Sequence, residues 1–212
     1  MRQYSIIDSL LTSADNSLRT LGGGYSTTNR SNPADSHTEA EMTTQEIRHV
    51  GGLMRINHCG EVCAQALYQG QSLTARLPQV REKMELAAKE ENDHLDWCHS
   101  RLIELNTHTS WLNPLWYLGS FGIGAVAGAA GDQWSLGFVV ETEHQVVKHL
   151  EGHINQLPTQ DNKSYAILEQ MKEDELNHAT AALEAGGAEL PPPVKRVMKL
   201  ISKIMTKTAY YV

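Results

Sequence analysis

The sequence predicts an all-α fold with one main domain, and three observations support this prediction. Aromatic residues make up only 6% of the chain, whereas Ala, Leu, Glu and Gln are plentiful, a balance that favours helices over strands. Helix start and stop signals recur along the chain, and no segment alternates polar and apolar residues over the length of a strand. A chain of 212 residues is long enough for one well-filled domain and short for two.

The first 44 residues are expected to form a polar, loosely ordered arm, which leaves residues 45–212 as the main domain. An apolar turn from Ile6 to Leu11 could form one short helix, and a run rich in Gly, Ser, Thr and Asn follows from Gly22 to Ser36. The N-terminus, MRQYSIIDSLL, lacks a cationic stretch followed by a long apolar core, so it does not resemble a signal peptide.

Two long helices are expected after the arm. Thr43 and Glu46 have the spacing of a capping box and predict a helix from residue 44 to about residue 76. Pro78 is well placed in the first turn of the next helix, which should end near residue 106.

Four further helical segments are expected in the second half of the chain. A Gly-rich apolar segment begins at Pro114 and ends near residue 131, and Asp132 can cap the next helix, which ends before Pro158. A helix over residues 159–185 is closed by two glycines, and a short basic helix follows the three prolines at 191–193.

Two of these helices carry a carboxylate and an imidazole in the middle of an apolar stripe. Glu91 and His94 share a helical face with Met84, Ala87 and Cys98. Glu175 and His178 share the equivalent face with Leu168, Met171 and Ala182. Burying an ionised carboxylate without a partner costs on the order of several kcal/mol, and a metal ion would offset that cost in both places.

Two more glutamates interrupt apolar faces. Glu143 lies on a face with Leu136, Val139, Val146 and Leu150, whereas Glu141 lies with Trp134, His144 and Lys148, so Glu143 is the preferred ligand. Glu61 shares a face with Asn57, Ala64 and Tyr68. Tyr68 could hydrogen-bond near the metal or simply pack in the core.

The spacing of these residues predicts two helical hairpins that each supply one Glu and one Glu-x-x-His. Glu61 precedes Glu91 by 30 residues, and Glu143 precedes Glu175 by 32. Two such hairpins are typical of a ferritin-like four-helix bundle with a dinuclear centre. Its metal ligands would be Glu61, Glu91, His94, Glu143, Glu175 and His178. Carboxylate oxygens with one imidazole per metal suit iron or manganese better than copper or zinc.

The two remaining helices are extra to the bundle and point to a membrane surface. Residues 111–131 contain no charged residue, but six Gly and Pro residues favour a buried or membrane-dipping helix over a true span. The C-terminal helix is amphipathic, and Pro191–Val212 carries five basic residues and no acidic one. It could lie on anionic lipid or pack on the acidic body of its own chain or of another subunit.

Composition excludes some classes of function. The net charge of −7 argues against general nucleic-acid binding. The chain has three cysteines, Cys59, Cys63 and Cys98. A small, odd number of cysteines does not form a disulfide framework, which favours a reducing cytoplasm. Cys59 and Cys63 are expected to be small core residues rather than half of a zinc site.

With these residues in place, the sequence resembles the demethoxyubiquinone hydroxylase family of ubiquinone biosynthesis. The resemblance covers residues 46–210 and leaves the polar arm unmatched. It rests on four segments, RINHCGEVCAQALYQGQ (55–71), EENDH (90–94), TEHQVVKHL (142–150) and EDELNHATAALEAGG (173–187). The family's ligands fall on the same six residues, Glu61, Glu91, His94, Glu143, Glu175 and His178.

The resemblance also implies an activity. The chain would be a monooxygenase that hydroxylates the ring of a polyprenyl benzoquinol lacking one methoxy group, with O2, two iron ions and a two-electron reductant. Glu61, Glu91, Glu143 and Glu175 would act in catalysis as well as in binding iron. His149 matches a family histidine with a possible catalytic role, although Leu150 stands where some members have tyrosine, and a plain surface histidine is the alternative.

The resemblance further implies a peripheral protein on the cytoplasmic face of the cell membrane. Its partners would be the quinol, the membrane surface and either further copies of the chain or other ubiquinone-biosynthesis proteins. Two other functions remain open. A ferritin-like iron-storage or ferroxidase protein would form a large soluble cage, and a helical scaffold would bind no metal at all.

Overall fold

The computed structural model describes residues 6–212, with side chains from residue 11 onward, and this part of the chain contains helices and no strand. The elements are α1 (Ile6–Gly22), the short 3₁₀ helix η1 (Pro33–Ser36), α2 (Thr44–Thr74), α3 (Pro78–Glu104), α4 (Asn113–Ala130), α5 (Asp132–Ile154), α6 (Asn162–Glu184) and α7 (Pro192–Ala209). The first five residues, on which part of the signal-peptide argument rests, lie outside the described residues.

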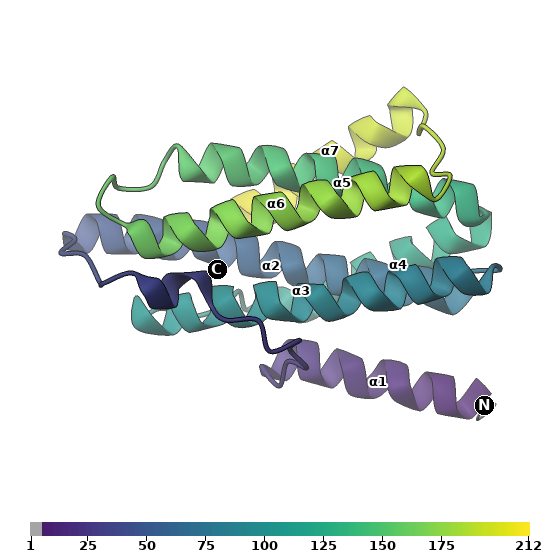
Figure 1. The fold of residues 1–212 in the computed structure, drawn as a ribbon, viewed down its shortest axis with the longest axis horizontal. Coiled ribbons are helices and arrows are strands. Elements are labelled where there is room, and N and C mark those ends of the chain that lie inside the picture. The colour runs from purple at the N-terminus through teal and green to yellow at the C-terminus, as the bar shows by residue number, and fades with distance from the viewer. Residues whose placement is uncertain (1–5) are drawn as a thin grey trace.

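Helices α2, α3, α5 and α6 form a four-helix bundle (Figure 1). Short connections over residues 75–77 and 155–161 make α2–α3 and α5–α6 two hairpins, and these hairpins pack through α3 on α6 and α2 on α5. The segment that carries α4 crosses from one hairpin to the other, as in ferritin-like bundles with one long connection. The all-α, ferritin-like prediction is therefore confirmed.

Two apolar clusters fill the bundle on either side of its middle. The first contains Met54, Trp97, Leu150 and Met171, one residue from each bundle helix among others. The second contains Tyr68, Met84, Val139 and Ala182, again one from each helix. In each of the four bundle helices, the predicted ligands lie between the residues of these two clusters. The polar groups therefore form a layer with an apolar cluster above it and another below it.

The helix starts show which local predictions hold. The capping box of Thr43 and Glu46 forms as expected. Asp132 does not cap α5, so that prediction is wrong; its carboxylate instead accepts hydrogen bonds from the backbone N–H groups of Arg76 and Leu77, just before α3. Asp132 therefore ties the start of α5 to the start of α3.

Helix α4 packs on α2 with its small and polar side inward. An added Cβ at Gly124 would collide with the backbone carbonyl of Leu67, so only glycine allows the two helices to come this close. The opposite side of α4 carries large apolar side chains, and Leu118 and Val126 are 69% and 72% exposed. The predicted buried helix is thus only half buried, with its apolar side facing outward.

Helix α7 also exposes apolar side chains. Val197, Leu200 and Ile204 are each more than half exposed, while Met205 and Ala209 pack against α2. Trp116 of α4 contacts the same cluster as Met205, so α4 and α7 lie beside one another on α2, on the side away from the viewer in Figure 1. None of the helices in residues 6–212 combines the length and hydropathy needed to cross a bilayer.

The predicted arm contains more helix than one short turn. Helix α1 spans 17 residues and packs against α2, and Ser17 hydrogen-bonds Tyr117 of α4 at 2.8 Å. After α1 the chain runs along α3 in an extended path before η1 and α2 (Figure 1). The division of the chain at residue 45 remains a prediction.

Candidate metal centre

The four glutamates selected from the sequence are all buried in the middle of the bundle, one on each helix. Glu61 comes from α2, Glu91 from α3, Glu143 from α5 and Glu175 from α6. One donor atom from each of Glu61, Glu91, His94 and Glu175 lies within 4.8 Å of the others, a spacing that can hold a metal ion.

The two histidines point the same ring nitrogen at a shared pair of carboxylates. His94 Nδ1 lies 3.0 Å from Glu91 Oε2 and 3.3 Å from Glu175 Oε1. His178 Nδ1 lies 3.2 Å from Glu91 Oε1 and 3.2 Å from Glu175 Oε2. Glu91 and Glu175 therefore present one oxygen to each histidine, which is the position of a carboxylate that bridges two metal ions.

Glu61 and Glu143 come from the other two bundle helices, α2 and α5. Glu61 Oε2 lies 3.9 Å from His94 Nδ1, so it belongs with His94. The group of four close donors among the described residues does not include Glu143, which is placed in this layer by its burial and by its hydrogen bond to Tyr68. The structure thus brings Glu61, His94 and His178 to the shared pair Glu91 and Glu175, with Glu143 buried in the same layer of the bundle.

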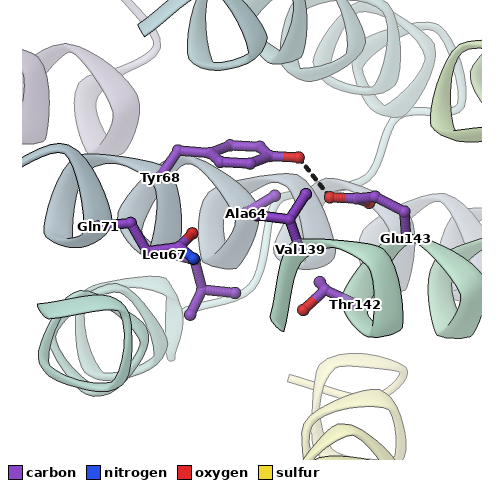
Figure 2. Close-up of a pocket in the computed structure, with 7 residues that line it drawn as sticks. All are labelled: Ala64, Leu67, Tyr68, Gln71, Val139, Thr142 and Glu143. Atoms are coloured by element: carbon purple, nitrogen blue, oxygen red, sulfur yellow. Dashed lines mark hydrogen bonds between the residues drawn. The ribbon is translucent and has the colours of Figure 1, made fainter. Parts of the chain in front are cut away.

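Tyr68 of α2 donates a hydrogen bond to Glu143 Oε1 (Figure 2). The second oxygen of Glu143 is buried and has no hydrogen-bond partner. Both residues line a crevice between α2 and α5 that is too narrow to hold a water molecule, together with Ala64, Leu67, Gln71, Val139 and Thr142. Of the two alternatives for Tyr68, the structure supports the hydrogen bond beside the candidate ligands.

Each histidine uses its other nitrogen to contact an acidic residue of the opposite hairpin. His94 Nε2 lies 2.9 Å from Asp174 Oδ2 on α6, and His178 Nε2 lies 2.6 Å from Glu90 Oε2 on α3. Hydrogen bonds of this kind orient a metal-binding histidine and raise the basicity of its free nitrogen. The contacts are reciprocal, because each outer acid immediately precedes the bridging glutamate of its own helix.

Sequence reasoning missed Asp174 and Glu90, although a signal was present. Both Glu-x-x-His motifs begin with two adjacent acidic residues, Glu90–Glu91 and Asp174–Glu175. Adjacent residues differ by about 100° around a helix, so the first acid of each pair looks solvated when its own helix is considered alone.

Burial and mutual repulsion raise the pKa of two of the buried carboxylates. Burial and the neighbouring Glu91 raise the pKa of Glu61, and burial and Glu175 raise the pKa of Glu143. Burial alone would raise the pKa of Glu91, but the charges of His94 and His178 and hydrogen bonds to both outweigh it and lower that pKa.

The histidines respond in the opposite sense. Burial disfavours the charged imidazolium of His178, but hydrogen bonds to Glu175 and Glu91 outweigh it and raise its pKa to about 12. For His94, the charge of Glu91 and a hydrogen bond to Asp174 also outweigh burial and raise the pKa. The cluster thus attracts positive charge strongly enough to hold protons at neutral pH.

These observations fit a metal site. The donors are hard oxygens and imidazole nitrogens, the types that hold divalent iron or manganese. Four carboxylates balance the charge of two divalent cations. The buried oxygen of Glu143 that has no hydrogen-bond partner is free to bind a metal ion. The buried Glu and His cluster can therefore bind metal.

Glu141 and His149 lie outside this cluster. Glu141 is half-buried at the surface and pairs with Lys195 at 3.4 Å, as its more solvated face suggested. His149 is half-buried on α5, its ring is stacked on His153, and burial and the nearby Lys199 lower its pKa. None of the described hydrogen bonds or ion pairs joins His149 to the six candidate ligands.

Cys59 and Cys98 are buried and Cys63 is half-buried, and all three thiols are free. Cys59 packs with Ile56, Met205 and Ala209, and Cys98 packs with Met54 and Met171. These positions agree with core packing rather than with a zinc site.

Comparison with known proteins identifies close relatives. Residues 48–209 match the family model described as ubiquinone biosynthesis protein COQ7. A 3-demethoxyubiquinol 3-hydroxylase of Acinetobacter baumannii is 61% identical over 100% of both chains. A protein with the same name from Nitrosococcus oceani is 58% identical over 100% of this chain and 99% of its own length. Another from Stutzerimonas stutzeri is 61% identical over 99% of this chain and 97% of its own length.

Proposed function

Because the chain belongs to the COQ7 family of ubiquinone biosynthesis proteins, we propose that it hydroxylates the ring of a demethoxyubiquinol with O2 at a di-iron centre. The observation that carries this proposal is the pair of histidines sharing Glu91 and Glu175 in a sealed layer of the bundle. The relatives' printed names supply the substrate class.

Each of the six residues has a role in this proposal. Glu91 and Glu175 would be shared by two ions, Glu61 and His94 would hold one ion, and Glu143 and His178 would hold the other. Two iron ions, when bound, would supply the redox chemistry that activates O2. The apolar clusters above and below keep bulk water out of the layer, and Tyr68 fixes the orientation of Glu143.

The reaction balances as a monooxygenation. A ring C–H bond becomes C–OH with one oxygen atom of O2, and the other oxygen atom leaves as water. This requires two electrons from an external reductant and two protons. The chain carries no dinucleotide-binding fingerprint of the Gly-x-Gly-x-x-Gly type, so the reductant is expected to come from another protein or a free donor.

The pocket beside Tyr68 and Glu143 is the proposed approach for the quinol ring (Figure 2). Its walls combine apolar side chains, such as Val139, with the polar groups of Gln71 and Thr142. Such a lining suits a ring that has an apolar face and polar oxygens. The pocket is narrow, so the ring must displace side chains to enter.

We further propose that α4 and α7 bind the cytoplasmic face of the cell membrane, making the protein peripheral. Exposed apolar residues on both helices form a surface that water does not favour. The five cations of α7 would contact anionic lipid headgroups. Because the polyprenyl tail of the substrate resides in the membrane, this surface would bring the pocket close to it.

His149 is proposed to affect turnover rather than metal binding. It lies beside His153 and Lys199 and away from the six ligands. Replacing it with alanine should lower turnover and leave the iron content unchanged; a lower iron content would contradict this role.

The activity is tested by deleting the gene and analysing the quinones. The deletion strain should accumulate the demethoxy-quinone, and a plasmid carrying the wild-type chain should restore the normal quinone. An unchanged quinone profile in the deletion strain would defeat the proposal. Sizing chromatography tests the iron-storage alternative, because a ferritin-like cage would be far larger than a small assembly of this chain.

A further inference from the structure

The N-terminal arm contacts α3 next to the metal centre. The backbone N–H and the hydroxyl of Thr28 both donate to the carboxylate of Asp93, a fully buried side chain adjacent to His94. Asn29 then adopts a φ of 65°, a left-handed conformation that asparagine tolerates better than most residues. The arm is therefore fixed to α3 at one point and turns sharply at the next residue.

Arg30 follows this turn and contacts three side chains around the centre. One guanidinium nitrogen lies 2.6 Å from Asp174 Oδ2, and another lies 4.0 Å from Asp93. The guanidinium also lies over the ring of Trp97, 4.9 Å from its centroid, in the geometry of a cation–π contact.

Two of the groups that Arg30 contacts also touch His94. Asp174 accepts from His94 Nε2, and the ring of Trp97 lies 5.4 Å from the ring of His94. Gln170 holds the second oxygen of Asp174 at 3.1 Å. The side chain of Asp174 is thus restrained from three directions, and His94 is completely buried.

The other half of the centre lacks such a cover. Glu90, the equivalent of Asp174, has a side chain that is 36% exposed, compared with 14% for Asp174. Among residues 11–212 no lysine or arginine pairs with Glu90. His178 is correspondingly the more accessible histidine, with 10% of its side chain exposed.

From this contrast we propose that Arg30 is a positioning residue that makes the two halves of the metal centre unequal. It restrains Asp174 and Trp97, and through them it holds His94 in the orientation that binds the ion. The ion bound by His94 and Glu61 is therefore the tighter one, and the ion bound by His178 and Glu143 exchanges first. The inference rests on the proposed metal centre, and it assigns a function to a segment outside residues 48–209.

Titration of the metal-free protein with Co²⁺ tests this inference, because the visible absorption of Co²⁺ reports each binding step. Wild-type protein should take up two ions per chain in two resolved steps. Arg30→Gln should weaken the tighter step by about tenfold, a loss typical of changes to groups that orient a ligand, and leave the weaker step unchanged. Glu90→Gln should weaken the other step.

Two further variants separate positioning from general damage to the fold. Arg19→Gln is the matched control, since Arg19 lies in the same arm and, among residues 11–212, forms an ion pair with Asp15 alone; both binding steps should stay at wild-type values. Arg30→Gln combined with Asp174→Asn should lose less affinity than the sum of the two single losses, because Arg30 acts in large part through Asp174.

Three results would overturn the inference: a single binding step in the wild type, an equal effect of Arg30→Gln on both steps or on neither, and additive losses in the double variant. Binding of fewer than two Co²⁺ per chain would instead contradict the metal centre itself. Failure of the inference and failure of the proposed function are thus distinguishable.

Discussion

The middle of the bundle and the outer surface of α4 and α7 depart from ordinary packing in opposite ways. In the bundle, four carboxylates and two imidazoles occupy positions that helical periodicity assigns to the core. On α4, small and polar residues face inward while Leu118 and Val126 face outward. Buried charge and exposed large apolar side chains are the two features that stability alone does not select.

The comparison teaches that each departure has its own kind of partner. The buried layer favours cations, since its carboxylates raise the pKa of both His94 and His178. The exposed surface attracts apolar material beside a basic helix, which suits the interface of a membrane. A substrate with a polar ring and a polyprenyl tail would use both regions at once.

The largest effect should come from removing a bridging carboxylate. Glu91→Ala or Glu175→Ala should lower activity by more than the 10–100-fold typical of outer groups, and should lower iron content. Glu141→Ala is the control on α5 and should do much less, because Glu141 pairs with Lys195 at the surface. If Glu141→Ala removed iron while Glu143→Ala did not, the assignment on α5 would be wrong.

Acidification should weaken metal binding strongly. The pKa values of His94, Glu61 and Glu143 are raised, and that of His178 is raised to about 12, so these groups hold protons that metal must displace. Affinity should therefore rise with pH and fall by at least about tenfold for each unit of acidification below neutrality. Calorimetry in buffers of different ionisation enthalpy would count the released protons; binding without proton release would contradict the raised pKa values.

The outer surface can be tested apart from the metal layer. Leu118→Glu or Val197→Glu should weaken binding to anionic vesicles about tenfold, because burying such a side chain contributes roughly 1.5 kcal/mol or more. Leu86→Glu is the matched control, since Leu86 is 58% exposed on α3 and not on α4 or α7. An equal loss in all three variants would show that the effect is one of general charge.

The smallest effect concerns the contact between α2 and α4. Gly124→Ala should destabilise the fold by about 1–3 kcal/mol, because the new methyl group would collide with the carbonyl of Leu67. Gly122→Ala has open space around its Cβ and should be neutral or slightly stabilising. Thermal unfolding measures both, and a stable Gly124→Ala protein would mean that the helices are free to separate.

The buried polar layer could be predicted because a carboxylate in an otherwise apolar stripe stands out on its own helix, and the four glutamates are buried as expected; their role as metal ligands remains a prediction. Glu143 could be chosen over Glu141 for this reason, and its burial agrees with that choice. The hairpins could be predicted because the similar spacings of Glu61 to Glu91 and of Glu143 to Glu175 indicate helices of similar length.

Contacts between distant segments could not be predicted in the same way. Asp174 and Arg30 do not belong to a repeating pattern of polar or apolar residues. Their contacts form only when α6, α3 and the arm pack together. Which side of α4 faces outward could not be predicted either, because its uncharged sequence has no polar stripe. The close approach of Gly124 to α2 decides the orientation of the helix.

Metal analysis combined with a Mössbauer spectrum of the purified protein tests most directly whether the bundle holds a carboxylate-bridged pair of ions. Glu91 and Glu175 each present oxygens to both histidines, so the expected result is two iron ions per chain with the signature of a coupled pair. Protein that binds a single isolated iron, or hundreds of irons in a cage, would contradict the account.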